Sequence, residues 1–188
     1  MVAIAEACAA GRIPARVALV ISNEPAAPGL AEATHRGLET LVIDHRDGGG
    51  REEHDQKMAS ALAARGVGLI CLAGYMRLLS PGFVRAHAGR IMNVHPSLLP
   101  AFPGKDASRQ AVAHGAKLSG VTVHFVDEGL DSGPIILQAA VPVYQDDTEE
   151  ALSARILKEE HRLYPEAIRL YFQDRLRIEG RRVRVTGR

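Results

Sequence analysis

The sequence has almost no net charge, few cysteines and no long apolar run. Its 23 Lys and Arg residues balance 22 Asp and Glu residues to a net charge of +1, which argues against a surface built to bind polyanions. No apolar stretch approaches the roughly 20 residues that a membrane-spanning helix needs. The first residues also lack the basic segment and apolar core of a secretion signal. We therefore expect a cytoplasmic protein that binds small molecules or proteins, and neither nucleic acid nor membrane.

The two cysteines, Cys8 and Cys71, lie far apart in apolar segments. In a cytoplasmic protein such a pair is more often two buried thiols than a disulfide, and that is what we expect here. Neither the cysteines nor the histidines follow the spacing of a metal site, so the sequence predicts no bound metal ion.

The length and the hydrophobic pattern predict a single α/β domain that spans residues 1–188. This length is enough for one proper core, and no segment resembles a linker. Strand-like apolar segments alternate with amphipathic segments, which predicts a mostly parallel twisted sheet with helices on both faces. The expected strands are Arg16–Ser22, Thr40–Ile43, Val67–Ala73, Ile91–Val94, Gly120–Val126 and Pro134–Val143, and the expected helices are Val2–Ala10, Gly29–Arg36, Glu52–Arg65, Pro81–Ala88, Ala107–His114 and a long one from about Thr148.

Three segments support more detailed predictions. Val67–Ala73 is apolar throughout, as a strand buried on both faces should be. Pro165 should break or kink the long helix before Glu166–Phe172. Arg175–Ile178 and Arg182–Val185 should pair as a small terminal hairpin, whose arginines read as a solvated surface because no aromatic residues are interleaved with them.

The run from Ile91 to Gly104 is the strongest candidate for a functional site. Asn93 and His95 lie two residues apart at the end of a predicted strand, so both side chains project from one face of the sheet. An amide can donate a hydrogen bond to a developing oxyanion, and an imidazole can move a proton near neutral pH. This combination is suited to acyl transfer.

The same run resembles a signature of the folate-dependent formyltransferases: Asn-Val-His-Pro-Ser-Leu-Leu-Pro from Asn93, followed by Phe-Pro-Gly ending at Gly104. A second signature, Asp-Glu-Gly-Leu-Asp-Ser-Gly-Pro-Ile-Ile, runs from Asp127 to Ile136. The resemblance extends from the first helix to about Arg177. It implies a Rossmann-like formyltransferase fold. It also implies transfer of a formyl group from 10-formyltetrahydrofolate to the amine of glycinamide ribonucleotide in purine biosynthesis, with no metal.

The resemblance assigns Asn93, His95 and Asp131 as the catalytic residues. Asp131 lies between two glycines and, taken alone, reads as a turn aspartate that binds its own backbone. In the family motif this position is the carboxylate that pairs with the catalytic histidine. A carboxylate within about 4–6 Å would favour the imidazolium form of His95.

The resemblance also implies a folate pocket, since a flat heterocycle needs apolar walls with a few polar groups. The residues of one wall are Leu72, Tyr75, Met76, Arg77, Leu78, Leu79 and Val84, and those of the other are Asp127, Glu128, Gly129 and Leu130. Without the resemblance, the first group reads as a loop with apolar residues tucked into the core. Arg77 could stay solvated or face the reacting groups.

Four further residues are assigned to substrate binding by resemblance: Arg51, Pro96, Ser97 and Glu160. Arg51 follows a run of three glycines that could equally be a flexible loop, and Glu160 could equally lie on a solvated helix face. Lys105 stands where the family usually has an apolar residue, and Ser108 stands where some relatives have histidine. These two departures leave the substrate contacts of the loop open.

His124 and the first helix leave alternatives open. His124 shares a strand face with Thr122, so it could support Asp131 or serve only the structure.

A helix that starts at Val2 lacks the strand and phosphate-binding turn that normally precede it, and relatives carry a Gly-Ser-Asn loop there. We expect that about one strand and a turn are absent, through a misassigned start or a naturally short chain, with some loss of stability at the unpaired sheet edge.

Two other functions remain open at this level. A hydrolase that delivers the formyl group to water would use the same three catalytic residues. A non-catalytic folate-binding remnant is the other possibility, because the phosphate loop is absent. The chain is expected to act as a monomer or a homodimer.

Overall fold

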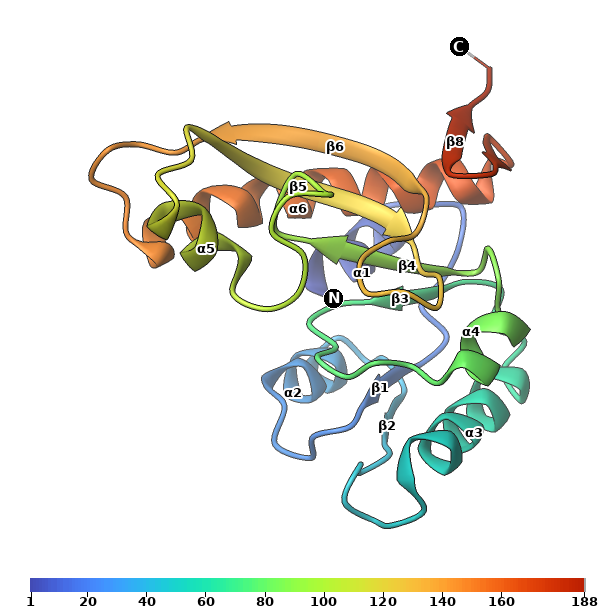
Figure 1. Ribbon diagram of the computed structural model, residues 1–188. Coiled ribbons are helices and arrows are strands. Elements are labelled where there is room, and N and C mark those ends of the chain that lie inside the picture. The colour runs from blue at the N-terminus through green and yellow to red at the C-terminus, as the bar shows by residue number, and fades with distance from the viewer. Residues whose placement is uncertain (188) are drawn as a thin grey trace.

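Figure 1 shows a computed structural model of the chain, which describes residues 1–187. It confirms the α/β fold, with helices packed on both faces of the sheet. The elements are α1 (Val2–Ala9), β1 (Val20–Ser22), α2 (Pro28–His35), β2 (Thr40–Val42), α3 (Gly50–Ala63), β3 (Ile70–Leu72), α4 (Pro81–Ala86), β4 (Ile91–His95), α5 (Ala107–Ala113), β5 (Leu118–Phe125), β6 (Ile135–Pro142), α6 (Glu149–Phe172), β7 (Leu176–Glu179) and β8 (Arg182–Val185).

The strands form a pair, β1–β2, and a six-stranded sheet in the order β3-β4-β5-β6-β8-β7. The β1–β2 and β3–β4 pairs are parallel, as the alternation of strands and helices predicts. The long β5–β6 hairpin extends the sheet with antiparallel pairing on both sides of β5. The predicted terminal hairpin is confirmed, since β7 and β8 pair antiparallel and β8 touches β6 at one position.

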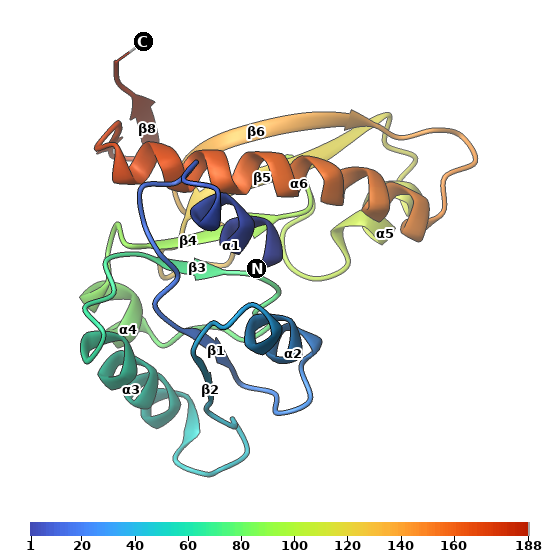
Figure 2. The ribbon, with the colours of Figure 1, turned by 180° about the vertical axis from the view of Figure 1, so that it is seen from behind.

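Two groups of buried side chains hold the helices to the sheet. On one face, α1 and α6 pack over β4, β5 and β6, as Figure 2 shows from behind. On the other face, α3 and α4 pack over β3 and β4 through a smaller cluster, which we call the second core cluster. Its buried members are Ile43, Met58, Leu62, Phe83, Val84 and Ile91.

The alternation expected along β5 is present. Val121, Val123 and Phe125 are almost fully buried in the larger cluster beneath α6. Thr122 and His124 point to the opposite face, where the candidate functional site lies, and both are also buried. One strand therefore supplies the core with one face and the site with the other.

The break predicted at Pro165 is wrong. α6 runs without interruption from Glu149 to Phe172 with Pro165 inside it. A proline in a helix removes one hydrogen bond and costs about 3 kcal/mol. Here Pro165 is itself buried beside Tyr164 and Ile168, and packing of this face against β5 and β6 offsets that cost. Within residues 1–187, neither this helix nor any other combines the length and apolar character needed to cross a membrane.

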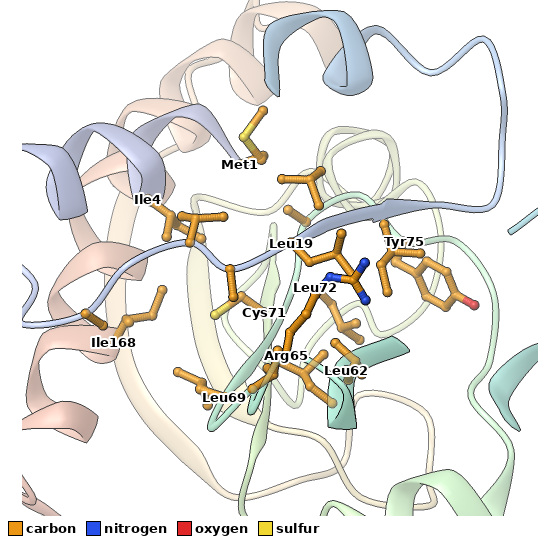
Figure 3. A pocket seen from close by; sticks show the side chains of 18 of the residues that line it. Met1, Ile4, Leu19, Leu62, Arg65, Leu69, Cys71, Leu72, Tyr75 and Ile168 are labelled. Atoms are coloured by element: carbon orange, nitrogen blue, oxygen red, sulfur yellow. The ribbon is translucent and has the colours of Figure 1, made fainter. Parts of the chain in front are cut away.

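The sheet is interrupted between β1 and β3. An apolar slot of about 570 Å³ separates the two strands, and Figure 3 shows Met1, Leu19 and Cys71 among the side chains around it. The slot runs between β1 and β3, and residues of both strands line it. The strands β1 and β3 are both shorter than the predicted segments Arg16–Ser22 and Val67–Ala73.

Two expectations about burial are wrong for the same reason. The residues of β3 are only half-buried, although the apolar run predicts a strand buried on both faces. Cys8 and Cys71 are free thiols, as predicted, but they too are half-buried. Both cysteines line the slot, which leaves them partly uncovered.

Candidate active site

Four polar side chains converge on the paired strands β4 and β5, one of them from the loop that follows β5. His95 Nδ1 lies 3.4 Å from Asp131 Oδ2, and His124 Nε2 lies 3.9 Å from Asp131 Oδ1. Asn93 Nδ2 lies 3.3 Å from His124 Nε2. The structure thus brings together the three residues predicted as catalytic, and it adds His124 to them.

Asp131 reaches this cluster because the loop between β5 and β6 folds back over the sheet. Its backbone adopts a left-handed conformation with φ of 49°, which aspartate tolerates better than most residues. Its Oδ2 atom also accepts a hydrogen bond from the Gly104 amide at 2.8 Å. Position 133, two residues after Asp131, accommodates only glycine, because a Cβ on Gly133 would lie 1.8 Å from the Phe125 carbonyl oxygen. The loop is therefore shaped to hold this carboxylate against His95.

His95 is 4% exposed, and both of its ring nitrogens face oxygen atoms that only accept hydrogen bonds. Nε2 donates to the Phe102 carbonyl oxygen at 2.8 Å, while Nδ1 faces the Asp131 carboxylate. A neutral imidazole has a single N–H, so this setting is fully satisfied only by the imidazolium form. The pair is suited to stabilising negative charge and to passing on a proton.

His124 is fixed in the opposite protonation state. Burial lowers the pKa of His124 below its ordinary value, although the nearby Asp131 charge and the hydrogen bond to the Phe125 carbonyl act the other way. Nδ1 donates to the Phe125 carbonyl oxygen at 2.8 Å, so Nε2 is free to accept from the Asn93 amide. His124 therefore orients Asn93. The sequence left this role open; the signal that identifies it is the pairing of the two residues across β4 and β5.

The loop between His95 and Gly104 is held by polar contacts that the sequence did not reveal. Thr122 Oγ1 donates to the Ser97 carbonyl oxygen at 2.7 Å and accepts from the Leu99 amide at 3.0 Å. Gln138 Nε2 donates to the Leu99 carbonyl oxygen at 2.9 Å. Thr122 and Gln138 are therefore further residues that shape the site, each from a neighbouring strand.

Two loops present apolar side chains beside the catalytic residues. Because β3 and β4 are parallel, the loop that follows β3 starts at the same sheet edge as His95. Met76, Leu78 and Leu130 are 70%, 59% and 56% exposed on this loop and on the one after β5. A salt bridge of 2.9 Å between Arg85 and Glu128 ties α4 to the second loop. Such exposed apolar side chains are typical of a ligand-binding surface.

The other predicted pocket residues lie deeper. Val84 is buried, and Leu72, Tyr75 and Leu79 pack against the second core cluster, which is the structural alternative that the sequence left open. The Asp127 carboxylate accepts hydrogen bonds from the Gly129 amide and the Ser132 hydroxyl, so it shapes its own loop. These residues form the frame behind the exposed apolar side chains.

A second hollow, of about 340 Å³, lies between α5, α6 and the start of the loop after β4. Pro96 and Glu160, two of the four residues predicted to bind substrate, line it together with Ser108. Burial raises the pKa of the Glu160 carboxyl group above its ordinary value.

The remaining two predicted substrate residues do not face this hollow. Ser97 is fully buried, and its hydroxyl donates to the Ala101 carbonyl oxygen at 2.5 Å. Arg51 lies in the first turn of α3, where no hydrogen bond or ion pair within residues 1–187 joins it to the catalytic residues. Across the same residues, no group of three His, Cys, Asp or Glu side chains is arranged to hold a metal ion.

The chain is similar to known proteins over most of its length. Residues 1–168 match the formyl transferase family. Phosphoribosylglycinamide formyltransferase of Escherichia coli (strain K12) is 40% identical over 176 residues, which are 94% of this chain and 83% of that protein. The crystal structure of glycinamide ribonucleotide transformylase 1 from Symbiobacterium toebii superposes with a TM-score of 0.97 and 56% identity, covering 98% of this chain and 87% of that one.

A longer relative matches over a small part of its own length. Trifunctional purine biosynthetic protein adenosine-3 of Drosophila melanogaster is 53% identical over 156 residues. These residues are 83% of this chain and 12% of that protein. The family match, the identity to shorter relatives and the shared fold agree, and this chain belongs to the formyl transferase family.

Proposed function

We propose that this chain transfers the formyl group of 10-formyltetrahydrofolate to the primary amine of glycinamide ribonucleotide, a step of purine biosynthesis. The observation that carries the proposal is the contact of His95 with Asp131 beside Asn93, with Pro96, the next residue after His95, lining the second hollow. Relatives named phosphoribosylglycinamide formyltransferase support the same reaction. We place the reaction in the cytoplasm and assign a monomer or a homodimer.

The reaction exchanges one carbon–nitrogen bond for another. The amine nitrogen attacks the formyl carbon, and negative charge develops on the formyl oxygen. Asn93 donates one N–H toward His124 and has a second N–H for this oxygen. His95 donates its Nε2 proton to the same oxygen once the substrate takes the place of the Phe102 carbonyl.

Proton transfer completes the exchange. The attacking amine loses a proton, and the departing folate nitrogen gains one, so no net proton is released. His95 is the relay, because the Asp131 carboxylate stabilises its positive charge and holds its ring in one orientation. The folate supplies the activated one-carbon unit, and the protein positions and polarises it.

The residues around the catalytic cluster fit the two substrates. Met76 and Leu78 offer an apolar surface for a flat heterocycle, and the Asp127–Leu130 loop, with the exposed Leu130, forms the opposite wall. Glu160 and Pro96 line the hollow that would take the ribose of the nucleotide. Arg77 and Arg51 are assigned to the folate pocket and to the substrate, respectively, by resemblance to the family.

An assay with and without the acceptor tests the proposal. Purified protein is given 10-formyltetrahydrofolate, and both formylated glycinamide ribonucleotide and free formate are measured. Formylated product that depends on the acceptor is the expected result. Formate released at the same rate without the acceptor would identify a hydrolase instead. Folate binding without either product would support the folate-binding remnant and contradict the proposed transfer.

A further inference from the structure

A second polar cluster is buried away from the catalytic residues, on α3. His54 and Asp55 are 3% and 2% exposed, and they lie among the side chains of the second core cluster. The mechanism above uses neither residue. Buried ionisable groups are costly unless their hydrogen bonds are satisfied, so their partners indicate what they stabilise.

Each partner belongs to a different element. Asp55 Oδ2 accepts a hydrogen bond from the Ser80 amide at 2.5 Å, at the residue that caps the N-terminus of α4. His54 Nε2 donates to the Ile43 carbonyl oxygen at 2.9 Å, just after β2. His54 Nδ1 lies 3.4 Å from Asp55 Oδ1. The two side chains thus connect β2, α3 and α4.

The contact with Ser80 fixes one end of the loop Ala73–Leu79, whose other end continues from β3. This loop carries Met76 and Leu78, which form the exposed apolar surface beside the catalytic residues. Tyr75 and Leu79 pack from the same loop against the second core cluster. A displacement of Ser80 would therefore move the surface that binds the folate.

The hydrogen-bond geometry also calls for a proton shared between the two side chains. Both ring nitrogens of His54 face oxygen atoms, and neither a carbonyl oxygen nor an ionised carboxylate can donate. The arrangement is satisfied when His54 carries both ring protons and Asp55 is ionised. Loss of one proton would leave the Nδ1 lone pair facing the Asp55 oxygen. The Tyr75 hydroxyl of the loop is buried without a hydrogen-bond partner, and burial, together with the nearby charge of Asp55, raises the pKa of Tyr75.

We propose that Asp55, held by protonated His54, is a positioning residue that fixes the Ala73–Leu79 loop and thereby sets the affinity of the neighbouring surface for reduced folate. The proposal rests on the proposed function, because it assumes that this surface binds folate. Asp55 acts through the Ser80 backbone and does not touch the reacting atoms.

The variant Asp55→Asn makes the proposal testable through its pH dependence. An asparagine offers one acceptor for the Ser80 amide and one N–H for the lone pair of a neutral His54. In the variant, the hydrogen-bonding groups of the pair all have partners when His54 is neutral. In the wild type, they all have partners when His54 is protonated and Asp55 is ionised. The pH dependence of folate binding should differ in sign between the two proteins.

The experiment measures the dissociation constant of tetrahydrofolate by calorimetry from roughly pH 5.5 to pH 8.5. Relative to the wild type, Asp55→Asn should bind about fivefold to tenfold more weakly at low pH and recover as pH rises. In turnover, Asp55→Asn should raise KM for the folate at low pH and leave kcat at saturation within about twofold of the wild type. Asp55→Ala, which cannot hold Ser80, should bind weakly at every pH.

The control is Ile156→Val, which weakens the larger core cluster without touching the loop. It should lower thermal stability and leave folate binding unchanged at every pH. If Asp55→Asn binds folate like the wild type across the range, or if Ile156→Val loses as much affinity, the assignment is overturned. If the wild type itself does not bind tetrahydrofolate, the proposed function fails and this assignment fails with it.

Discussion

Each catalytic side chain is held by a partner from another part of the chain. Asp131 comes from the loop after β5, and the His124 ring that orients Asn93 comes from β5 itself. His95 is held from two sides, by Asp131 and by the Phe102 carbonyl. The Asn93 amide is therefore already oriented toward a developing charge, and the His95 ring is held in place until the substrate displaces the Phe102 carbonyl.

Asp131→Asn tests the carboxylate at the residue scale. The amide keeps the size of the side chain but removes the charge that favours the His95 imidazolium, so kcat should fall by about 10²–10⁴. The matched control is Asp174→Asn, the same chemical change at an exposed residue that also has a left-handed backbone and pairs with Arg177. It should keep full activity. Equal rates for the two variants would show that the charge of Asp131 is not needed.

Burial of His124 leads to a prediction of how the free energy of unfolding depends on pH. Burial lowers the pKa of His124 in the folded protein, whereas in the unfolded chain it is about 6.5. Below about pH 6.5 the unfolded state therefore binds more protons, and this contribution to the free energy of unfolding is lost as pH falls toward the folded-state pKa.

Urea unfolding at pH 8 and at pH 5.5 measures this contribution. The loss of stability between the two values should be smaller in His124→Gln than in the wild type, because glutamine does not titrate. His35→Gln changes an exposed histidine on α2 and should retain the wild-type difference. A variant His124→Gln that loses as much stability as the wild type would show that His124 does not stay neutral in the folded state.

The sequence alone identifies some of these site residues and misses others, and the difference has a physical reason. Asn93 and His95 lie two apart on one strand, so local periodicity is enough to pair them. Asp131 is far away along the chain and was identified only through its motif. Thr122 and Gln138, which hold the loop after β4, were missed because their roles depend on strand register, which the local sequence does not specify.

At the scale of the element, α6 shows that tertiary packing can override a local rule. Pro165 disfavours a helix, yet the buried face of α6 keeps it continuous across the sheet. Next to it, the Tyr164 hydroxyl lies 3.0 Å from the Leu72 carbonyl oxygen and 2.8 Å from that of Met92. Burial raises the pKa of Tyr164 well above its ordinary value, so the hydroxyl keeps its proton and donates. This one group anchors α6 to both β3 and β4.

Tyr164→Phe removes that anchor and should lower the free energy of unfolding by about 1–2 kcal/mol, because two buried carbonyls lose a donor. Urea unfolding provides the measurement. Tyr171→Phe is the matched control, since the Tyr171 hydroxyl makes one long contact of 3.4 Å at the exposed end of the helix. Its effect should stay below about 0.5 kcal/mol. If both variants lower the free energy of unfolding by the same amount, the contacts of the Tyr164 hydroxyl with β3 and β4 stabilise the fold no more than the long contact of Tyr171 does.

At the scale of the whole molecule, the slot divides the sheet into two parts. Val20 and Ser22 direct their backbone groups to β2, so the N–H and C=O of Ile21 face the slot. By the same alternation, the N–H and C=O of Cys71 face the slot from β3. Within residues 1–187, the slot therefore has two unpaired strand edges and apolar walls from Ile4 and Leu62. This is the shape and the hydrogen-bonding pattern that a single added strand would complete.

An apolar five-residue segment joined ahead of Met1 through a short polar turn should fill the slot, because Met1 lies at its edge. Net of the ordering entropy, burial of its side chains should add about 2–4 kcal/mol. That corresponds to a rise in Tm of roughly 5–10 °C. Hydrogen exchange should slow at the Ile21 and Cys71 amides, which gain acceptors only if the segment pairs as a strand. A Gly/Ser segment of equal length is the control and should change neither quantity. If the apolar segment raises Tm without slowing these two amides, it covers the surface in some other way and the sheet remains divided.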